Sequence, residues 1–509
     1  MAGARTLYLI SFSREDSGAV KLILPLSVIL LLCCAATLPV AHAELALEEC
    51  RISAGPGSRS IKARCGTLER HENPADPASP LLSLSVAVVS ALSLEPEPDP
   101  FVPIAGGPGQ STIEFYSMLS HAFEDIRRTR DIVLLDQRGT GGSAKMECDI
   151  GDEVIEGQLS TEETIALTRV CVETLPHNPE FFTTSVAVDD LEALRVALSY
   201  SQLNVYGISY GTRVAQHFVR QHPDSVRSVI LDGVVPPQIA LGAGIAIEAQ
   251  KALHNIFDRC TESAACNERF PDIAGEFASL ETRLTDASVS VDLPNPVTGA
   301  PDSVQFGEAE LAAAIRLLSY DPRTVALMPM LIHEAVAENY GPLAAQFLMI
   351  MEDLSDSIAI GMHNAVVCTE DTPFYEGVGD DRDELESTYI GPMMVEALEA
   401  ICSVWPAGVI DPEFKTALKT DKPVLLLSGD ADPITPPYFA DLAATDLENK
   451  KHLTGLHQGH GQAGTGCMPA VMGRFIESLS VADEDLDPDK CLLRRHAMPF
   501  FLNFSGPNP

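Results

Sequence analysis

The sequence predicts an α/β protein with a mostly parallel, doubly wound sheet and a mostly helical cap inserted before the last strands. Short apolar segments alternate with amphipathic segments between residues 101 and 232, which is the pattern of parallel strands covered by helices. Residues 236–420 break this alternation with mainly helical sequence, and the strand pattern returns within 421–509. We therefore expect a sheet domain made from residues 44–235 and 421–509, with a cap over its strand ends.

Each expected element follows from its hydrophobic period. Apolar runs of strand length occur at residues 82–92, 101–105, 131–135, 203–206, 226–231, 423–428 and 451–456. Helical periodicity occurs at residues 189–198, 212–221 and 468–479, in a charged stretch between Cys148 and Cys171, and over most of the cap, where residues 288–306 indicate a hairpin. Residues 44–80 are rich in Pro and Gly, so we expect them to form a surface extension.

Composition and charge exclude several classes of function. The chain has 509 residues, 46% of them hydrophobic, which is typical of a folded protein with a large core. Its formal net charge is −38 at pH 7. Such a surface repels a phosphate backbone and anionic lipid, so we expect no nucleic-acid partner and no docking on lipid headgroups. The sequence leaves the oligomeric state open.

The N-terminus has the pattern of a secretory signal peptide. Arg5, Arg14 and Lys21 precede an apolar run over residues 22–36, and Ala41-His42-Ala43 follows as an Ala-x-Ala cleavage site. We predict a signal peptide over residues 1–43 and an exported protein, periplasmic or secreted, without stable membrane association after cleavage. The alternative is an uncleaved anchor, because the apolar stretch approaches the length that spans a bilayer.

The cysteines predict disulfides and no metal site. Twelve cysteines are present, and Cys33 and Cys34 lie within the predicted signal peptide. The others form five local couples, as expected in an oxidising compartment. The predicted pairs are Cys50–Cys65, Cys148–Cys171, Cys260–Cys266, Cys368–Cys402 and Cys467–Cys491. The sequence contains no Cys-x-x-Cys and no His-x-x-x-His, so zinc-ligand spacing is absent.

The stretch Gly207-Ile-Ser-Tyr-Gly211 fits a nucleophile elbow. A strand-like run precedes it and a helix-like run follows, and the strained turn between them would expose the hydroxyl of Ser209. Small residues two positions either side leave room for the strand and helix to cross. The motif alone is weak, because Gly-x-Ser-x-Gly also occurs by chance.

A glycine-rich loop earlier in the chain is a candidate oxyanion hole. Gly106-Gly107-Pro108-Gly109 follows the strand at residues 101–105, so its backbone can approach a ligand closely. We expect the backbone N–H groups of Tyr210 and Gly107 to hold the oxyanion. Asp136 and Arg138 follow the strand at 131–135, and we interpret them as braces of the glycine loop.

A candidate acid and a candidate base complete the catalytic set around Ser209. In this class of fold the chain order is Ser, then Asp or Glu, then His, and Ser209, Asp432 and His460 satisfy that order just after predicted strands. Asp430 is the rival acid, and we prefer Asp432 because Pro433 stiffens the turn after it. His457 is the rival base, and we prefer His460 because it lies between two glycines.

Five motifs are present together: Gly106–Gly109, Asp136–Ser143, Gly207–Gly211, Gly429–Thr435 and Gly459–Gly461. As a set they resemble those of the α/β-hydrolase-fold serine exopeptidases, meaning the proline iminopeptidases and, more closely, the secreted tripeptidyl-aminopeptidase-like proteins. The resemblance covers residues 50–491 and implies release of N-terminal residues from peptides. It also implies a cap carboxylate that binds the free amine, for which Glu370 is our candidate.

The expected mechanism needs no metal or organic cofactor, since the serine, histidine and aspartate supply the nucleophile, the base and its orienting acid. Two alternatives stay open. One is an esterase or lipase on the same fold, because the same residues hydrolyse either bond. The other is a non-catalytic binding protein on this fold, which an intact set of Ser, Asp and His disfavours.

Overall fold

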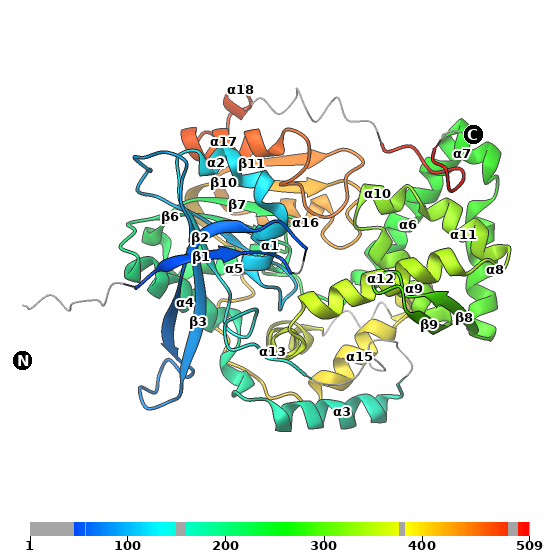
Figure 1. The fold of residues 1–509 in the computed structure, drawn as a ribbon, viewed down its shortest axis with the longest axis horizontal. Coiled ribbons are helices and arrows are strands. Elements are labelled where there is room, and N and C mark those ends of the chain that lie inside the picture. The colour runs from blue at the N-terminus through cyan, green and yellow to red at the C-terminus, as the bar shows by residue number, and fades with distance from the viewer. Residues whose placement is uncertain (1–44, 56, 149–158, 376–381, 487–496, 508–509) are drawn as a thin grey trace, which may run out of the picture. The chain divides into compact units, whose positions relative to one another are not determined.

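The computed structural model describes residues 45–55, 57–148, 159–375, 382–486 and 497–507. The predicted signal peptide and Cys491 lie outside these residues. The largest feature is a nine-stranded sheet with the order β1-β2-β3-β5-β4-β6-β7-β10-β11 (Figure 1). Its strands are β1 (Glu48–Ile52), β2 (Ile61–His71), β3 (Leu81–Val89), β4 (Phe101–Ile104), β5 (Ile132–Leu135), β6 (Leu203–Ile208), β7 (Val226–Asp232), β10 (Thr420–Gly429) and β11 (Leu447–Gly455).

The direction of the strands brings the candidate residues to one edge. The sheet is parallel from β5 across to β11, whereas β1, β2 and β3 pair antiparallel. Parallel strands end at the same edge, and that edge is where ligands bind in open α/β sheets. Ser209 follows β6, Asp432 follows β10 and His460 follows β11, while Asp232 is the last residue of β7.

Alternate residues of the central strands face opposite sides of the sheet. Val205 and Val229 belong to one apolar cluster, whereas their neighbours Tyr206 and Ile230 belong to another. Helices cover both faces, which confirms the predicted doubly wound architecture. The first face packs against α3 (Thr161–Thr174), α4 (Thr184–Ala197), α5 (Tyr210–Gln221) and α16 (Pro437–Ala443), and the second against α1 (Thr112–Leu119), α2 (Glu124–Arg127), α17 (Met468–Ser478) and α18 (Asp483–Leu486).

The N-terminal region belongs to the sheet, so the expectation of a surface extension over residues 44–80 was wrong. β1 and β2 add two antiparallel strands beside β3. In β2, Ile61 and Ala63 are buried and Lys62 and Arg64 are exposed. This period-two pattern is that of a strand with one buried face, and the turn residues that dominate the composition lie between the strands.

Between β7 and β10 the chain forms the cap. Its elements are α6 (Ile245–Glu262), α7 (Ala264–Arg269), α8 (Ile273–Asp286), β8 (Val289–Pro294), β9 (Pro301–Phe306), α9 (Glu308–Leu318), α10 (Pro322–Val325), α11 (Met328–Val336), α12 (Gly341–Ser357), α13 (Ile360–Glu370), α14 (Arg382–Glu386) and α15 (Met393–Cys402). β8 and β9 form an antiparallel hairpin where the sequence indicated one. The cap has its own apolar cluster, which includes Leu253, Leu280, Ile315 and Leu331.

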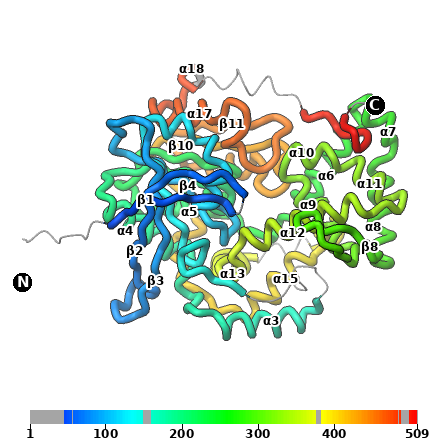
Figure 2. The backbone as a smooth tube through the Cα atoms, viewed as in Figure 1, coloured from blue at the N-terminus to red at the C-terminus, as the bar shows by residue number. Residues whose placement is uncertain are grey.

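The packing differs from the expected boundaries at two places. Met362 and Val366 of α13 pack in the cluster that includes α4 and α5, so this helix joins the sheet domain rather than the cap cluster. Conversely, Phe500 and Leu502 pack in the cap cluster, although we expected residues 421–509 to belong to the sheet domain. The N–H of Phe501 donates to the carbonyl of Ala326 at 2.8 Å, and Figure 2 shows this last segment beside α7.

Disulfides tie these elements together. The structure contains the pairs Cys50–Cys65, Cys148–Cys171, Cys260–Cys266 and Cys368–Cys402, each as predicted. Cys467 is also disulfide-bonded, while its predicted partner Cys491 lies outside the described residues. Within the described part of the chain, no helix combines the length and apolar character needed to cross a bilayer.

Candidate active site

Ser209 occupies a strained turn between β6 and α5. Its backbone has φ 54° and ψ −127°, a conformation that residues with a Cβ rarely adopt. A Cβ on Gly207 would collide with the backbone of Gly211, and a Cβ on Gly211 would collide with the carbonyl groups of Ile104 and Ala105. The two glycines are therefore required for the close crossing of strand and helix. Ser209 caps α5, whose first N–H groups point toward the turn.

Asp432 and His460 form the acid–base pair that the sequence predicts. Nδ1 of His460 lies 2.8 Å from Oδ2 of Asp432. The hydroxyl of Thr435 donates to the same Oδ2 at 2.7 Å, and the N–H groups of Ile434 and Thr435 donate to Oδ1 at 2.9 Å each. The carboxylate is thus held from several directions, which fixes the side of the imidazole that carries its proton.

The electrostatics of this pair favour an ion pair despite burial. Burial alone would raise the pKa of Asp432, but the charge and hydrogen bond of His460 and the bonds from Thr435 outweigh it and hold that pKa below its usual value. Burial lowers the pKa of His460, whereas Asp432 and, more weakly, Asp232 raise it, and the net pKa is raised. The imidazolium that forms during proton transfer is therefore stabilised by its surroundings.

Asp430 and His457, the alternative acid and base, are bonded to each other in a turn beside the site. Oδ1 of Asp430 accepts the backbone N–H of His457 at 2.6 Å. His457 itself has φ 56° and lies on the exposed side of that turn. The geometry therefore favours Asp432 and His460 over Asp430 and His457.

Ser209 and His460 both lie beside the end of β7. The N–H of Ser209 donates to the carbonyl of Asp232 at 2.9 Å. A Cβ placed on the next residue, Gly233, would lie 3.0 Å from Cε1 of His460. The backbone of Ser209 and the imidazole of His460 therefore lie beside two consecutive residues, Asp232 and Gly233.

The glycine loop after β4 lies against the nucleophile. A Cβ on Gly106 would approach Cβ of Ser209 at 3.0 Å and its Oγ at 3.6 Å, and Gly107 has φ 102°. The loop can therefore bring backbone N–H groups close to a substrate oxygen, as an oxyanion hole requires. Tyr210 begins α5, so its N–H also has no acceptor within the helix.

Asp136 braces this glycine loop, whereas Arg138 is bonded to helix α4. Oδ1 of Asp136 accepts from Ser111 Oγ at 2.8 Å and from the N–H of Ile113 at 3.0 Å, which anchors the start of α1 directly after the glycines. Arg138 instead donates to both oxygens of Asp190 on α4, at 2.6 and 2.8 Å. Our interpretation of Arg138 as a brace of the glycine loop is therefore revised.

Glu370 lies in a closed environment, unlike an amine-binding carboxylate at an open cleft. Its side chain is fully buried, and its oxygens accept from the N–H of Thr184 at 2.7 Å and from the Thr184 hydroxyl at 2.9 Å. That hydroxyl lies 2.6 Å from the phenol oxygen of Tyr210. Burial raises the pKa of Glu370 to about 7, with Arg213 opposing the shift. Glu370 thus supports Tyr210, the residue next to Ser209, through the hydroxyl of Thr184.

The adjacent Asp371 is equally committed. Its carboxylate accepts from Arg213 at 2.8 and 3.0 Å and from Lys415 at 3.1 Å. The end of α13 therefore joins α5 through a buried charged cluster. This cluster could not be predicted from the sequence, because nothing local to residues 365–371 shows what they face.

Two further residues at the site were also missed. Tyr320, at the end of α9, accepts the backbone N–H of His460 through its carbonyl oxygen at 2.8 Å, and its ring lies edge-on to the imidazole at 5.4 Å. Asp232 is fully buried at the end of β7. The sequence signal for Asp232 was its position directly after a strand, which it shares with Asp432.

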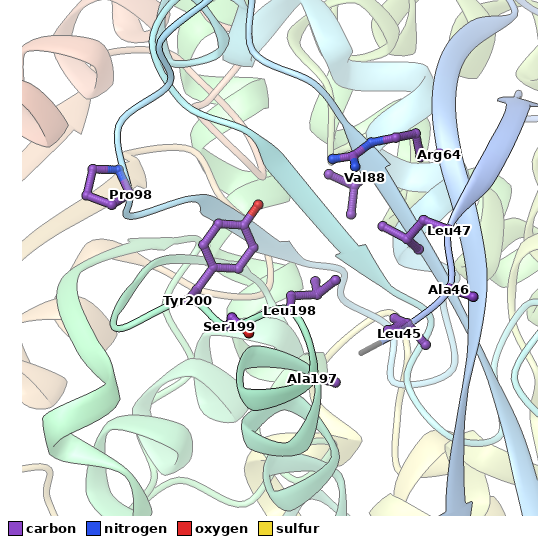
Figure 3. A pocket seen from close by; sticks show the side chains of 10 residues that line it. All are labelled: Leu45, Ala46, Leu47, Arg64, Val88, Pro98, Ala197, Leu198, Ser199 and Tyr200. Carbon is purple, nitrogen blue, oxygen red and sulfur yellow. The ribbon is translucent and has the colours of Figure 1, made fainter. Parts of the chain in front are cut away.

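A surface pocket lies apart from these residues. It has a volume of about 720 Å³, and Leu45, Arg64 and Tyr200 are among the side chains that line it (Figure 3). The side chains come from the region of β2 and the end of α4, not from the loops that follow β6, β10 and β11. The pocket is therefore not the place where Ser209 acts.

Comparisons with known proteins agree with the fold. Residues 99–262 match the family described as the alpha/beta hydrolase fold, and residues 387–488 match the family of TAP-like proteins. The serine protease Hip1 of Mycobacterium tuberculosis is 25% identical over 68% of this chain and 71% of its own length. The tripeptidyl aminopeptidase of Streptomyces lividans is 24% identical over 65% of each chain. The proline iminopeptidase of Arabidopsis thaliana is 30% identical over 35% of this chain and 44% of its own.

These matches span only part of each relative, down to 38% of the Escherichia coli protein YuaR. The fold and the site define an α/β hydrolase with a serine nucleophile elbow. Within that class, the chain is similar to the TAP-like proteins and to relatives named as a serine protease, a tripeptidyl aminopeptidase and a proline iminopeptidase.

Proposed function

We propose that the protein is a serine exopeptidase that releases N-terminal residues or short peptides through an acyl-enzyme. The observation that carries the proposal is the contact of 2.8 Å between Asp432 and His460 beside a serine on a strained elbow. Ser209 attacks the scissile carbonyl, His460 takes its proton and returns it to the leaving amine, and Asp432 orients His460. Water then hydrolyses the acyl-enzyme with His460 again as the base.

The oxyanion that forms on the carbonyl is stabilised by backbone N–H groups. The N–H of Tyr210 points from the start of α5, and Gly107 lies on the loop that touches Ser209. Preorganised donors of this kind stabilise the developing charge without reorganisation, and removing one costs roughly 10²–10³-fold in rate. Asp136 contributes indirectly, because it holds Ser111 and Ile113 just beyond the glycines.

The cap supports an exopeptidase rather than an endopeptidase. The segment between β7 and β10 touches the site from two sides, through Tyr320 at the histidine loop and through Ala359 at the start of α13, whose N–H donates to the carbonyl of Gly109 at 3.1 Å. Ile358 also packs against the glycine loop. We expect these contacts to restrict the passage of a long chain past Ser209. The names of the relatives, a tripeptidyl aminopeptidase and a proline iminopeptidase, point the same way.

Recognition of the substrate amine is part of the proposal, but Glu370 is withdrawn as its partner. A cationic amine is costly to bury without a carboxylate. Both oxygens of Glu370 already accept from Thr184. The partner is therefore another carboxylate of this strongly acidic chain.

Export is also part of the proposal. The disulfides among the described cysteines suit an oxidising compartment. They support export, which we propose is directed by the predicted signal peptide, residues 1–43.

The test has two stages. A fluorophosphonate probe should label the purified protein at Ser209, and Ser209→Ala, which leaves the fold unchanged, should abolish both the labelling and peptide hydrolysis. A free-amine peptide amide is then compared with its N-acetylated twin. Hydrolysis should fall at least about tenfold on acetylation, equivalent to about 1.4 kcal/mol of transition-state binding.

Each outcome has a consequence. Labelling with equal rates on the two peptides would remove the aminopeptidase assignment. Faster turnover of short-chain esters than of any peptide amide would favour an esterase. A folded protein that neither labels nor turns over substrate would favour a binding protein.

A further inference from the structure

Asp232 holds the loop that carries His460. Its carboxylate accepts the N–H of Gln462 at 2.7 and 2.9 Å and the N–H of Ala463 at 2.8 Å. The side chain of Gln462 in turn donates to the carbonyl of Gly459 at 2.9 Å. His460 therefore lies inside a short loop that is closed on itself by Gln462 and fastened to β7 by Asp232.

The same residue also fastens the nucleophile. The carbonyl oxygen of Asp232 accepts the N–H of Ser209 at 2.9 Å. The hydroxyl of Tyr206, on the strand that leads into Ser209, donates to Oδ2 of Asp232 at 2.9 Å. One residue thus connects the strand before the nucleophile, the nucleophile itself and the histidine loop.

The side chain is fully buried, so its charge is not screened by solvent. Burial raises the pKa of Asp232 to about 6, and its hydrogen bonds and the nearby His460 oppose the shift. The titratable groups that face it are Tyr206 on β6 and His460, whose imidazole also faces Asp432. At neutral pH the carboxylate is ionised, which suits a site where the two backbone neighbours can only donate.

We infer that Asp232 is a positioning residue of the active site, which fixes the His460 loop relative to Ser209 and supplies a second negative charge to the imidazole. This inference rests on the proposed serine mechanism. Asp432 holds the imidazole through Nδ1, whereas Asp232 acts through the loop backbone and through space. Its negative charge raises the pKa of His460, so its removal should lower that pKa.

The experiment measures the rate of covalent labelling of Ser209 by a fluorophosphonate between pH 5 and 9, which depends on neutral His460 and not on the substrate class. Asp232→Asn keeps an acceptor oxygen and removes the charge. The midpoint of its acidic limb should move to lower pH by at least about half a unit. Asp441→Asn, which removes the same charge from an exposed side chain on α16, should leave the midpoint unchanged.

Tyr206→Phe provides a second variant if Asp232→Asn does not fold. It removes a hydrogen bond that lowers the pKa of Asp232, so that carboxyl group becomes neutral over more of the acidic limb. The midpoint should then move in the same direction by a smaller amount. A folded Asp232→Asn variant with an unshifted midpoint would overturn the inference, even if its labelling were slower. A wild-type protein that resists labelling at every pH would instead overturn the proposed function.

Discussion

The backbone N–H of His460 donates to the carbonyl oxygen of Tyr320 at 2.8 Å, so the cap is bonded directly to the candidate general base. The contact is close because the preceding residue is glycine. A Cβ on Gly459 would collide with that same carbonyl group. The position of the imidazole therefore depends on how the cap is seated.

Gly459→Ala should lower both stability and activity. The added methyl group would overlap backbone atoms of Tyr320. Either the cap or the histidine loop must shift to relieve this overlap, which should lower the free energy of unfolding by about 1–3 kcal/mol. Displacing the imidazole by about 1 Å can reduce kcat/KM roughly 100-fold. Gly341→Ala is the matched control, because a Cβ there, at the start of α12, meets open space. Urea unfolding and steady-state kinetics measure the two effects, and equal behaviour of the two variants would contradict the contact.

Asp432→Asn should be far more damaging than Asp430→Asn. Oδ1 of Asp432 accepts from two backbone N–H groups, so an asparagine would keep its oxygen there and turn its NH₂ group toward His460. This favours the wrong tautomer of the imidazole and removes the charge that stabilises the imidazolium, and kcat/KM should fall on the order of 10³–10⁴-fold. An amide at residue 430 still offers an oxygen to the N–H of His457, so its loss should stay below about tenfold. Initial rates on a peptide amide distinguish the variants. The reverse order would mean that Asp430 is the acid.

Glu370→Gln should change how stability depends on pH. In the fold, burial raises the pKa of Glu370 to about 7 from its ordinary value of 4.5. The unfolded chain thus loses this proton at a lower pH than the folded protein. The stabilising contribution of protonated Glu370 to the free energy of unfolding is therefore lost as pH rises from about 4.5 to 7. The variant does not titrate there. Its stability relative to wild type should therefore improve by up to about 3 kcal/mol over that interval.

The measurement for Glu370→Gln is urea unfolding of both proteins at pH 4.5 and pH 8. The glutamine amide can still accept from the N–H of Thr184 and donate to its hydroxyl, so the fold should be retained. A difference that does not change with pH would show that folding does not raise the pKa of Glu370.

The Cys368–Cys402 disulfide should contribute more to stability than Cys260–Cys266. The two bonds span 34 and 6 positions of sequence. Constraint of the unfolded chain grows with the loop, to about 4 kcal/mol for the first bond and about 2 kcal/mol for the second. Replacing each pair by alanines and comparing the Tm values tests the order. A larger loss from the short loop would mean that local packing outweighs chain entropy.

The parts of the site that the sequence predicts are those with a demanding local geometry. The elbow requires small residues around Ser209, and the backbone at φ 54° with Gly207 and Gly211 bears this out. Asp432 and His460 follow predicted strands, and a parallel sheet brings such ends together. The α/β architecture was predictable for the same reason, since strand and helix periods are local.

The remaining parts depend on contacts between distant segments. Glu370 resembled an available carboxylate until the structure showed Thr184 bonded to both of its oxygens. Tyr320 acts through a backbone carbonyl, which no side-chain motif marks. β1 and β2 lie among turn residues, and only the pairing of β1 with β2 and of β2 with β3 shows that they belong to the sheet.

The packing of Phe500 and Leu502 against the cap bears on the order in which the chain folds. A nascent chain leaves the ribosome from its N-terminus and folds its domains as they emerge. The cap helices precede β10 and β11 in the chain, yet their apolar cluster includes side chains that follow both strands. The cap therefore cannot bury its core fully until residues 500–502 have also emerged, so chaperones that shield apolar surface, before or after export, have most to protect in this part of the molecule.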